Sequence, residues 1–128
     1  MLRLAAASAV ARVAGFLLRI TGSGGTSAPG KILLALAPRA IEQRSARLER
    51  GCAVISATNG KTTTSAILAE IMRADGASLV HNRAGANMAG GIAATLNDQR
   101  GDFGLFEIDE FWLPVLVEQL RPRSVLLA

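Results

Sequence analysis

The residues with the clearest chemical potential lie at positions 58–63, which read Thr-Asn-Gly-Lys-Thr-Thr. Gly60 would let the backbone approach a phosphate closely, and Lys61 would place a cation beside it. Thr62 offers a hydroxyl oxygen to Mg²⁺, and the first N–H groups of a following helix would point at the anion. The segment therefore predicts a phosphate-binding loop at the start of a helix.

An ordinary capped helix is the alternative, with Thr58 or Asn59 as the capping residue. A cap alone does not explain why one lysine and four threonines crowd a single turn. We therefore expect the whole segment to contact nucleotide: Thr58, Asn59, Gly60, Lys61, Thr62 and Thr63. The general phosphate-loop pattern has a glycine five residues before Gly60, where Ile55 stands, so this is not an ordinary Walker loop.

Elements of alternating character surround the loop. The apolar run Cys52–Ser56 predicts a buried strand, and residues 62–74 predict a helix with one apolar face. Alternation of strands and helices implies right-handed crossovers and a mainly parallel sheet, so the fold class is α/β with flanking helices. The further elements expected are strands at 78–81, 103–108 and 124–128, a loop at 84–88, and helices at 89–96 and 111–120.

The first 50 residues form a helical, basic segment distinct from residues 51–128. They carry eight Lys or Arg against two Asp or Glu, whereas residues 51–128 carry six against eight. We expect a helix at 3–20, a turn-rich loop at 21–30, and helical character at 31–49 that Pro38 breaks in two. The helix at 3–20 is expected to pack on the domain or to lie on a membrane surface, because charges interrupt it too often for a spanning segment.

Composition narrows the partners and the compartment. Four Phe, one Trp and no Tyr leave little for stacking on bases, so we expect no nucleic-acid partner. A solvated helix face is the plain explanation of the basic excess. Cys52 is the only cysteine, which fits a reducing, cytoplasmic setting, and its apolar neighbours indicate a buried thiol.

The segment 58–63 resembles the Thr-Asn-Gly-Lys-Thr-Thr/Ser signature of the Mur ligase family, whose usual form has glycine where Ala57 stands. Further segments are similar to the MurT-type subunits of lipid II isoglutaminyl synthase, and their order and spacing make the resemblance specific. These segments are His-Asn-Arg-Ala-Gly-Ala-Asn at 81–87, Phe-Glu-Ile-Asp-Glu at 106–110, and the glycine-rich pattern at 19–31.

The resemblance implies an ATP-dependent ligase subunit that amidates the D-glutamate α-carboxylate of lipid II in peptidoglycan synthesis, through an acyl phosphate. It implies ATP and Mg²⁺ as cofactors, a GatD-type glutamine amidotransferase subunit as partner, and a cytoplasmic location, at the inner face of the membrane if residues 3–20 touch lipid. Full subunits of this kind are longer and often carry a zinc ribbon. We therefore expect residues 51–128 to be the front part of the central ATP-binding domain, and this piece alone to be inactive.

The same resemblance assigns the site residues. Lys61 and Glu107 would be catalytic, and Glu107 would bind Mg²⁺ together with Thr62, at the edge where ligands collect in open α/β sheets. The plainer alternative for Glu107 is an exposed carboxylate at a strand end. Asn82 and Arg83 follow the preceding strand and are expected to contact nucleotide, although Arg83 is equally well explained as a surface arginine.

Three polar residues near these positions are not assigned to the site. Asp109 and Glu110 precede the helix at 111–120 and are as suited to capping it as to chemistry. His81, the only histidine, is assigned no role.

Other function classes stay open. The chain could belong to another Mur-type amide ligase, amino-acid-adding or folylpolyglutamate-like, or to a general P-loop NTPase with Asp109 as its metal-binding aspartate. A non-catalytic, membrane-associated module built on the basic N-terminal half is the remaining alternative, and it leaves 58–63 unexplained. ATP binding by the wild type against Lys61→Ala separates the nucleotide-binding classes from this module, for which no difference is expected.

Overall fold

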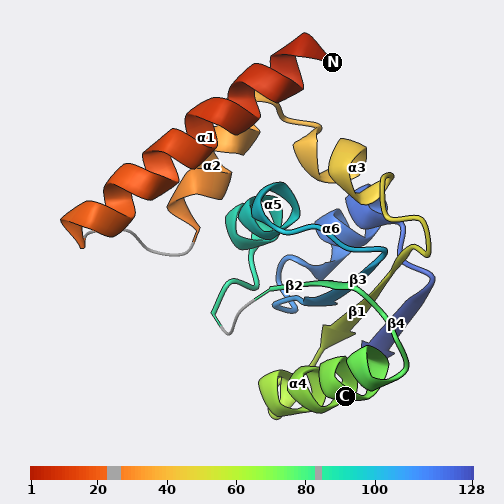
Figure 1. Ribbon diagram of the computed structural model, residues 1–128. Helices are drawn as coiled ribbons and strands as arrows, with labels where there is room; N and C mark the ends of the chain where they lie inside the picture. Colours follow the sequence, from red (N-terminus) through yellow and green to blue (C-terminus); the bar gives the residue numbers. More distant parts are fainter. Residues whose placement is uncertain (23–26, 83–84) are drawn as a thin grey trace.

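Four parallel strands form one sheet, with helices on both of its faces (Figure 1). The computed structural model describes residues 1–22, 27–82 and 85–128. Along the chain the elements are α1 (Leu2–Thr21), α2 (Ala28–Leu36), α3 (Ala40–Ser45), β1 (Cys52–Ser56), α4 (Lys61–Ala74), β2 (Leu79–His81), α5 (Ala89–Asp98), β3 (Phe103–Glu107), α6 (Leu113–Leu120) and β4 (Ser124–Leu127). The predicted α/β class with an N-terminal helix is confirmed.

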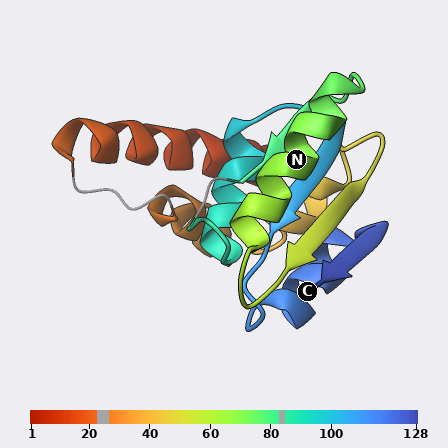
Figure 2. The same ribbon diagram turned by 90° about the horizontal axis from the view of Figure 1, so that it is seen from below.

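The strand order β2-β3-β1-β4 places the two central strands where chain direction across the sheet reverses. From β1 the chain crosses through α4 to β2, whereas from β3 it crosses through α6 to β4 on the far side of β1 (Figure 2). Ligands of open α/β sheets bind at the carboxyl ends of strands at such a reversal. The register pairs Ile55 of β1 with Glu107 of β3, so the loop after β1 and the end of β3 lie side by side.

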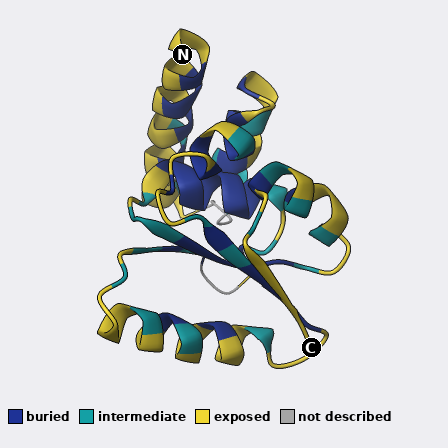
Figure 3. Cartoon of the chain, turned by 90° about the vertical axis from the view of Figure 1, so that its right-hand side faces the viewer, coloured by how far each residue is buried: buried dark blue, intermediate teal, exposed yellow. Residues whose placement is uncertain are grey.

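Alternation along the strands divides the apolar residues between two clusters. Val54 and Phe106 belong to the larger cluster, which α1, α2, α3, α5 and α6 cover. Ile55 and Leu105 point to the other face, where Ala69 of α4 packs on them. Figure 3 shows α4 alone on its side of the sheet. Apolar residues from both 1–50 and 51–128 therefore share the larger cluster.

Close contact between α2 and α5 explains Gly30 of α2 and Gly90 of α5. A Cβ on Gly30 would stand 1.7 Å from the carbonyl oxygen of Gly90, so neither backbone could come this near with a larger residue. The loop predicted at 21–30 is too long, because α2 already begins at Ala28. Pro29 lies in its first turn, where proline's fixed φ suits a helix and its missing N–H is not needed.

Other element bounds follow their local chemistry. Pro38 separates α2 from α3, as predicted, and β1 has the predicted bounds. Helix α6 begins at Leu113 rather than 111, because the Asp109 carboxylate and carbonyl accept hydrogen bonds from the N–H groups of Phe111 and Trp112 and form a turn first.

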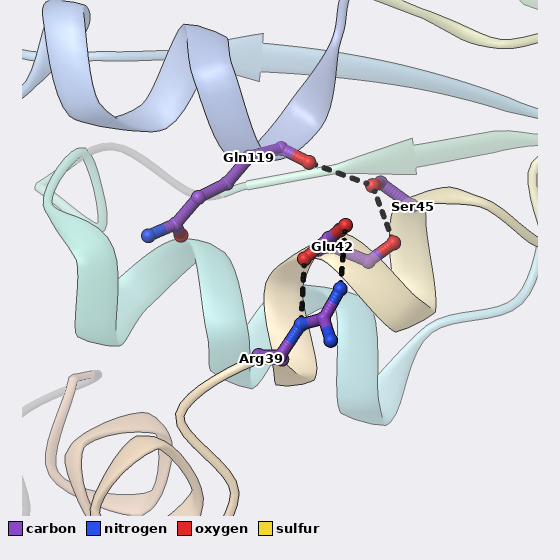
Figure 4. A network of polar contacts seen from close by, with 4 residues as sticks. All are labelled: Arg39, Glu42, Ser45 and Gln119. Atoms are coloured by element: carbon purple, nitrogen blue, oxygen red, sulfur yellow. Dashed lines mark hydrogen bonds and ion pairs between the residues drawn. The ribbon is translucent and has the colours of Figure 1, made fainter.

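Polar contacts at α3 fix this short helix to α6 (Figure 4). Arg39 donates two hydrogen bonds to the Glu42 carboxylate, at 3.0 and 3.1 Å. The Ser45 hydroxyl lies within hydrogen-bonding distance of the carbonyl oxygens of Glu42 and Gln119. Because Gln119 belongs to α6, this hydroxyl joins the segment before the sheet to the helix that follows β3.

Candidate nucleotide-binding site

The loop between β1 and α4 leads into a helix start that no side chain caps. Gly60 adopts φ +75°, a left-handed conformation, and a Cβ there would meet no atom within 4 Å, so the glycine serves the backbone angle rather than space. Helix α4 begins at Lys61 with no side-chain cap, so neither Thr58 nor Asn59 caps it. The first N–H groups of α4 are therefore left for a ligand, and Thr58, Asn59, Thr62 and Thr63 around them face solvent.

Ala57 is compatible with the loop although the resembled signature has glycine there. Its side chain is buried, and Arg121 is the sole non-glycine residue with positive φ in the part of the chain that the structure describes. Ala57 therefore has an ordinary backbone conformation, which alanine adopts without strain.

Lys61 folds back over its own loop. Its ammonium donates to the carbonyl oxygen of Ala57 at 3.1 Å and lies 3.8 Å from a carboxylate oxygen of Glu110. The lysine side chain is 15% exposed and that of Glu110 is 49% exposed. The lysine is thus held over the loop by one neutral acceptor and one half-exposed carboxylate, both of which a phosphate could replace. Of the two acidic residues before α6, Asp109 forms the local turn and Glu110 faces the lysine.

Glu107 is buried at the carboxyl end of β3 and is not the exposed carboxylate of the alternative explanation. It is 2% exposed. Thr62 donates its hydroxyl to Oε1 at 2.8 Å, and the Ser65 hydroxyl lies 3.4 Å from Oε2. A buried carboxylate needs such donors, because burial without them is unfavourable. The structure thus brings together Thr62 and Glu107, the two residues predicted to share a metal ion.

Asn82 fixes the backbone on which Glu107 is carried. Its side-chain oxygen accepts the Glu107 N–H at 2.9 Å, and its amide nitrogen donates to the carbonyl oxygens of Glu107 at 2.7 Å and of Ala86 at 2.9 Å. Asn82 is 2% exposed. The amide thereby extends the hydrogen-bond ladder between β2 and β3 by one step. A positioning role is what this geometry supports, while a contact between Asn82 and nucleotide stays a prediction.

The Gln99 side chain fixes the backbone of His81, the residue before Asn82, in the same way. Its side-chain oxygen accepts the His81 N–H and its nitrogen donates to the His81 carbonyl, both at 2.9 Å. The imidazole Nε2 lies 3.4 Å from the Ser65 hydroxyl. Burial lowers the pKa of His81, Arg73 lowers it further, and Glu107 opposes both. The surroundings of the ring therefore favour its neutral form.

A cavity of about 320 Å³ lies beside these side chains, between α4 and the ends of β2 and β3. Its lining includes Ser65, His81 and Gln99, which sequence reasoning did not assign to the site. Ser65 could have been predicted from the sequence, because it lies three residues after Thr62 on the same face of the helix. The cavity is lined by Thr62, Ser65, Ala66, Arg73, His81, Asn82, Gln99 and Glu107.

The donor set fits Mg²⁺ better than a metal held by protein alone. Among the described residues no group of three or more His, Cys, Asp or Glu could hold a metal ion. Mg²⁺ at nucleotide sites takes one or two carboxylates, with the other positions left to water and phosphate oxygens. Neighbouring ligands of octahedral Mg²⁺ are about 2.9 Å apart, and the Thr62 and Glu107 oxygens are 2.8 Å apart. Arg83, the remaining predicted site residue, lies outside the described residues.

The sequence is similar to those of known ligase subunits. No family model matches the sequence. The MurT subunit of lipid II isoglutaminyl synthase (glutamine-hydrolyzing) from Staphylococcus aureus strain N315 is 31% identical over 110 residues, which are 84% of this chain and 25% of that subunit. The MurT subunit from Streptococcus pneumoniae is 30% identical over 112 residues, 84% of this chain and 24% of that subunit. The chain thus spans about a quarter of these relatives.

A solved structure shows the same fold. UDP-N-acetylmuramoylalanyl-D-glutamyl-2,6-diaminopimelate–D-alanyl-D-alanyl ligase from Acinetobacter baumannii superposes with a TM-score of 0.60 at 18% identity. The match covers 75% of this chain and 22% of the ligase chain. At this identity the likeness concerns the fold alone.

Proposed function

We propose that this chain, a homologue of MurT subunits within the Mur ligase family, is the MgATP-binding part of a ligase that converts a carboxylate of lipid II to an amide. The observation that carries the proposal is the contact at 2.8 Å between the Thr62 hydroxyl and the buried Glu107 carboxylate. It joins the uncapped phosphate loop to the end of β3 at the point where strand order reverses.

Binding of the triphosphate follows from the loop geometry. The N–H groups at the start of α4 would donate to phosphate oxygens, and Gly60 holds the backbone in the left-handed conformation that exposes them. Lys61 would exchange the Ala57 carbonyl and the Glu110 carboxylate for the β- and γ-phosphates. The Lys61 ammonium already lies over the loop, so its side chain would lose little conformational entropy when the triphosphate binds.

Thr62 and Glu107 would hold Mg²⁺, with phosphate oxygens and water as its other ligands. The ion would neutralise charge on the transferred phosphoryl group. Asn82 positions the Glu107 carboxylate through hydrogen bonds to the Glu107 backbone. The Ser65 hydroxyl lies within hydrogen-bonding distance of the carboxylate's second oxygen, Oε2. These residues bind and orient, which is the main contribution of proteins to phosphoryl transfer.

The reaction is carboxylate activation. The γ-phosphoryl group of ATP passes to the carboxylate and gives an acyl phosphate and ADP, and ammonia then displaces phosphate and leaves the amide. The D-glutamate α-carboxylate of lipid II as substrate, a GatD-type subunit as the source of ammonia, and a cytoplasmic site of action are part of the proposal. The support is similarity to MurT subunits, over about a quarter of their length.

An amidation assay tests the function. The complete open reading frame and residues 1–128 are each incubated with lipid II, ATP, Mg²⁺, glutamine and a GatD-type subunit, and the product is weighed by mass spectrometry. We expect amidated lipid II from the complete protein, its loss with Lys61→Ala, and no product from residues 1–128. Lysine-dependent ATP turnover with a different carboxylate would replace the substrate and retain the ligase class. Absence of ATP binding would refute both.

A further inference from the structure

Helix α1 has apolar side chains on two opposite faces. Leu4, Ala7 and Ala11 are at most 6% exposed and belong to the larger core cluster. The opposite face carries six large apolar side chains that are between 49% and 89% exposed. They are Leu2, Val10, Val13, Phe16, Leu17 and Ile20. Figure 3 shows α1 on the outside of the molecule, with much of its length coloured as exposed. An ordinary surface helix has polar residues on this side.

Arginines border the exposed apolar face. At about 100° per residue, Arg3 lies on one side of it, and Arg12 and Arg19 lie on the other. Their guanidinium groups donate to backbone carbonyl oxygens, of Leu36 at 2.9 Å, Asn97 at 3.0 Å and Gly15 at 3.3 Å respectively. The first acidic residue of the chain is Glu42, and the ion pairs found among the described residues do not involve α1. These cations therefore keep their charge available to an anionic partner.

Further positive charge gathers beside Arg12. Arg100 shares the Asn97 carbonyl oxygen with it, and Arg44, which is 9% exposed, donates to the Asn97 side chain and to Ser8 of α1. Burial lowers the pKa of Arg44, and the charges of Arg47, Arg100 and Arg12 lower it further. A cluster without a carboxylate partner produces a positive field along this side of the helix.

We propose that α1 lies on the surface of an anionic lipid bilayer, with its exposed apolar face in the acyl boundary and its bordering arginines at the lipid phosphates. An apolar strip with arginines at both of its borders matches the layering of a bilayer surface, whereas a protein partner would require no such border. By length and a mean hydropathy of 1.5, α1 could also cross a membrane. A membrane-crossing α1 would have to remove Leu4, Ala7 and Ala11 from the core cluster. The folded domain therefore holds α1 along the bilayer surface.

Vesicle sedimentation of the complete protein tests the proposal. Phosphatidylcholine vesicles with and without phosphatidylglycerol are compared at low and high salt. We expect binding to the anionic vesicles, and weakening by salt. Because burial of one large apolar side chain contributes about 1.5–3 kcal/mol, Phe16→Glu and Ile20→Glu should each lower the partition coefficient by roughly tenfold or more. Arg12→Gln should lower it about fivefold, and only on anionic vesicles.

Two matched variants on another helix give the control. Ile67 and Ile71 of α4 are 58% and 61% exposed, so Ile67→Glu and Ile71→Glu make the same chemical change elsewhere and should leave vesicle binding unaltered. Retained MgATP binding in every variant shows that the protein is folded. The proposal is overturned if the wild type stays in solution with anionic vesicles, if the α4 variants lose binding equally, or if Phe16→Glu instead disrupts a dimer or a contact with the amidotransferase subunit.

Discussion

Removal of the Asn82 amide is the perturbation whose effect the structure predicts most directly. Asn82→Ala deletes three hydrogen bonds, to the Glu107 N–H, the Glu107 carbonyl and the Ala86 carbonyl. Glu107 is 2% exposed, so its backbone groups cannot turn to bulk water. At about 1 kcal/mol for each buried hydrogen bond, we expect a loss of about 3 kcal/mol in the free energy of unfolding.

Urea unfolding followed by Trp112 fluorescence measures this loss. Trp112 is the only tryptophan in the sequence. A change of about 3 kcal/mol lowers the urea midpoint by about 1–3 M at the m-values of small domains. Asn59→Ala serves as the control, because Asn59 is exposed in the loop and surface changes of this kind alter stability by less than about 0.5 kcal/mol.

The effect of Asn82→Ala on nucleotide binding shows whether Asn82 positions Glu107 for the metal ion or only stabilises the fold. We expect Asn82→Ala to weaken nucleotide binding mainly when Mg²⁺ is present, because the variant loosens Glu107 and leaves the loop at 58–63 intact. Asn82→Asp should not rescue it, since a carboxylate accepts the Glu107 N–H but cannot donate to the two carbonyl oxygens. A loss of stability below about 1 kcal/mol, or equal weakening with and without Mg²⁺, would refute the reasoning.

Further predictions concern single groups of the same structure. Burial lowers the pKa of His81 from 6.5, so the unfolded chain takes up the proton first. The contribution of the neutral His81 ring to the free energy of unfolding is present in full above about pH 6.5 and is lost as the pH drops below that value. In a pH series of thermal unfolding, His81→Gln should remove this part of the pH dependence. Burial raises the pKa of the Cys52 thiol to about 11, so a disulfide reagent at pH 8 should label it only after urea is added. Gly60→Ala forces a side chain into the left-handed conformation and should reduce stability by about 1 kcal/mol in denaturant titration, without a steric clash. Glu107→Gln should abolish the Mg²⁺ dependence of ATP binding in calorimetry while leaving metal-free binding within about threefold; unchanged Mg²⁺ dependence would remove Glu107 from the metal site.

The elements that position the site could be read from the sequence because their signals are local. Cys52–Ser56 is a short apolar run between turn residues, and Gly60 with Lys61 and the threonines marks the start of α4. The resemblance to Mur ligases implied that Thr62 and Glu107 share a metal ion, and the place of Glu107 at the carboxyl end of a strand was consistent with it. The start of α2 was missed, because Pro29 and Gly30 suit a loop and a helix's first turn equally well.

The rest of the site depends on tertiary contacts that leave no periodic pattern. Asn82 and Gln99 hydrogen-bond to backbone groups of neighbouring segments, and nothing in their local sequence distinguishes this from exposure. His81 acquires its neighbours only when β2 pairs with β3 and α4 packs above them. The Lys61 contact with Glu110 likewise joins the start of α4 to a turn 49 residues further along the chain, which no short motif encodes.

Calorimetric titration of ATP in the presence of Mg²⁺ tests the central claim most directly. Lys61 and Lys31 are the only lysines, and Lys31 lies on α2, so Lys61→Ala and Lys31→Ala form a matched pair. A hydrogen bond to a charged group contributes about 1.5–3 kcal/mol, so Lys61→Ala should raise the Kd by roughly ten- to a hundredfold. Lys31→Ala should leave the Kd unchanged. Equal affinity of the wild type and Lys61→Ala would contradict the assignment of residues 58–63 as a phosphate-binding loop.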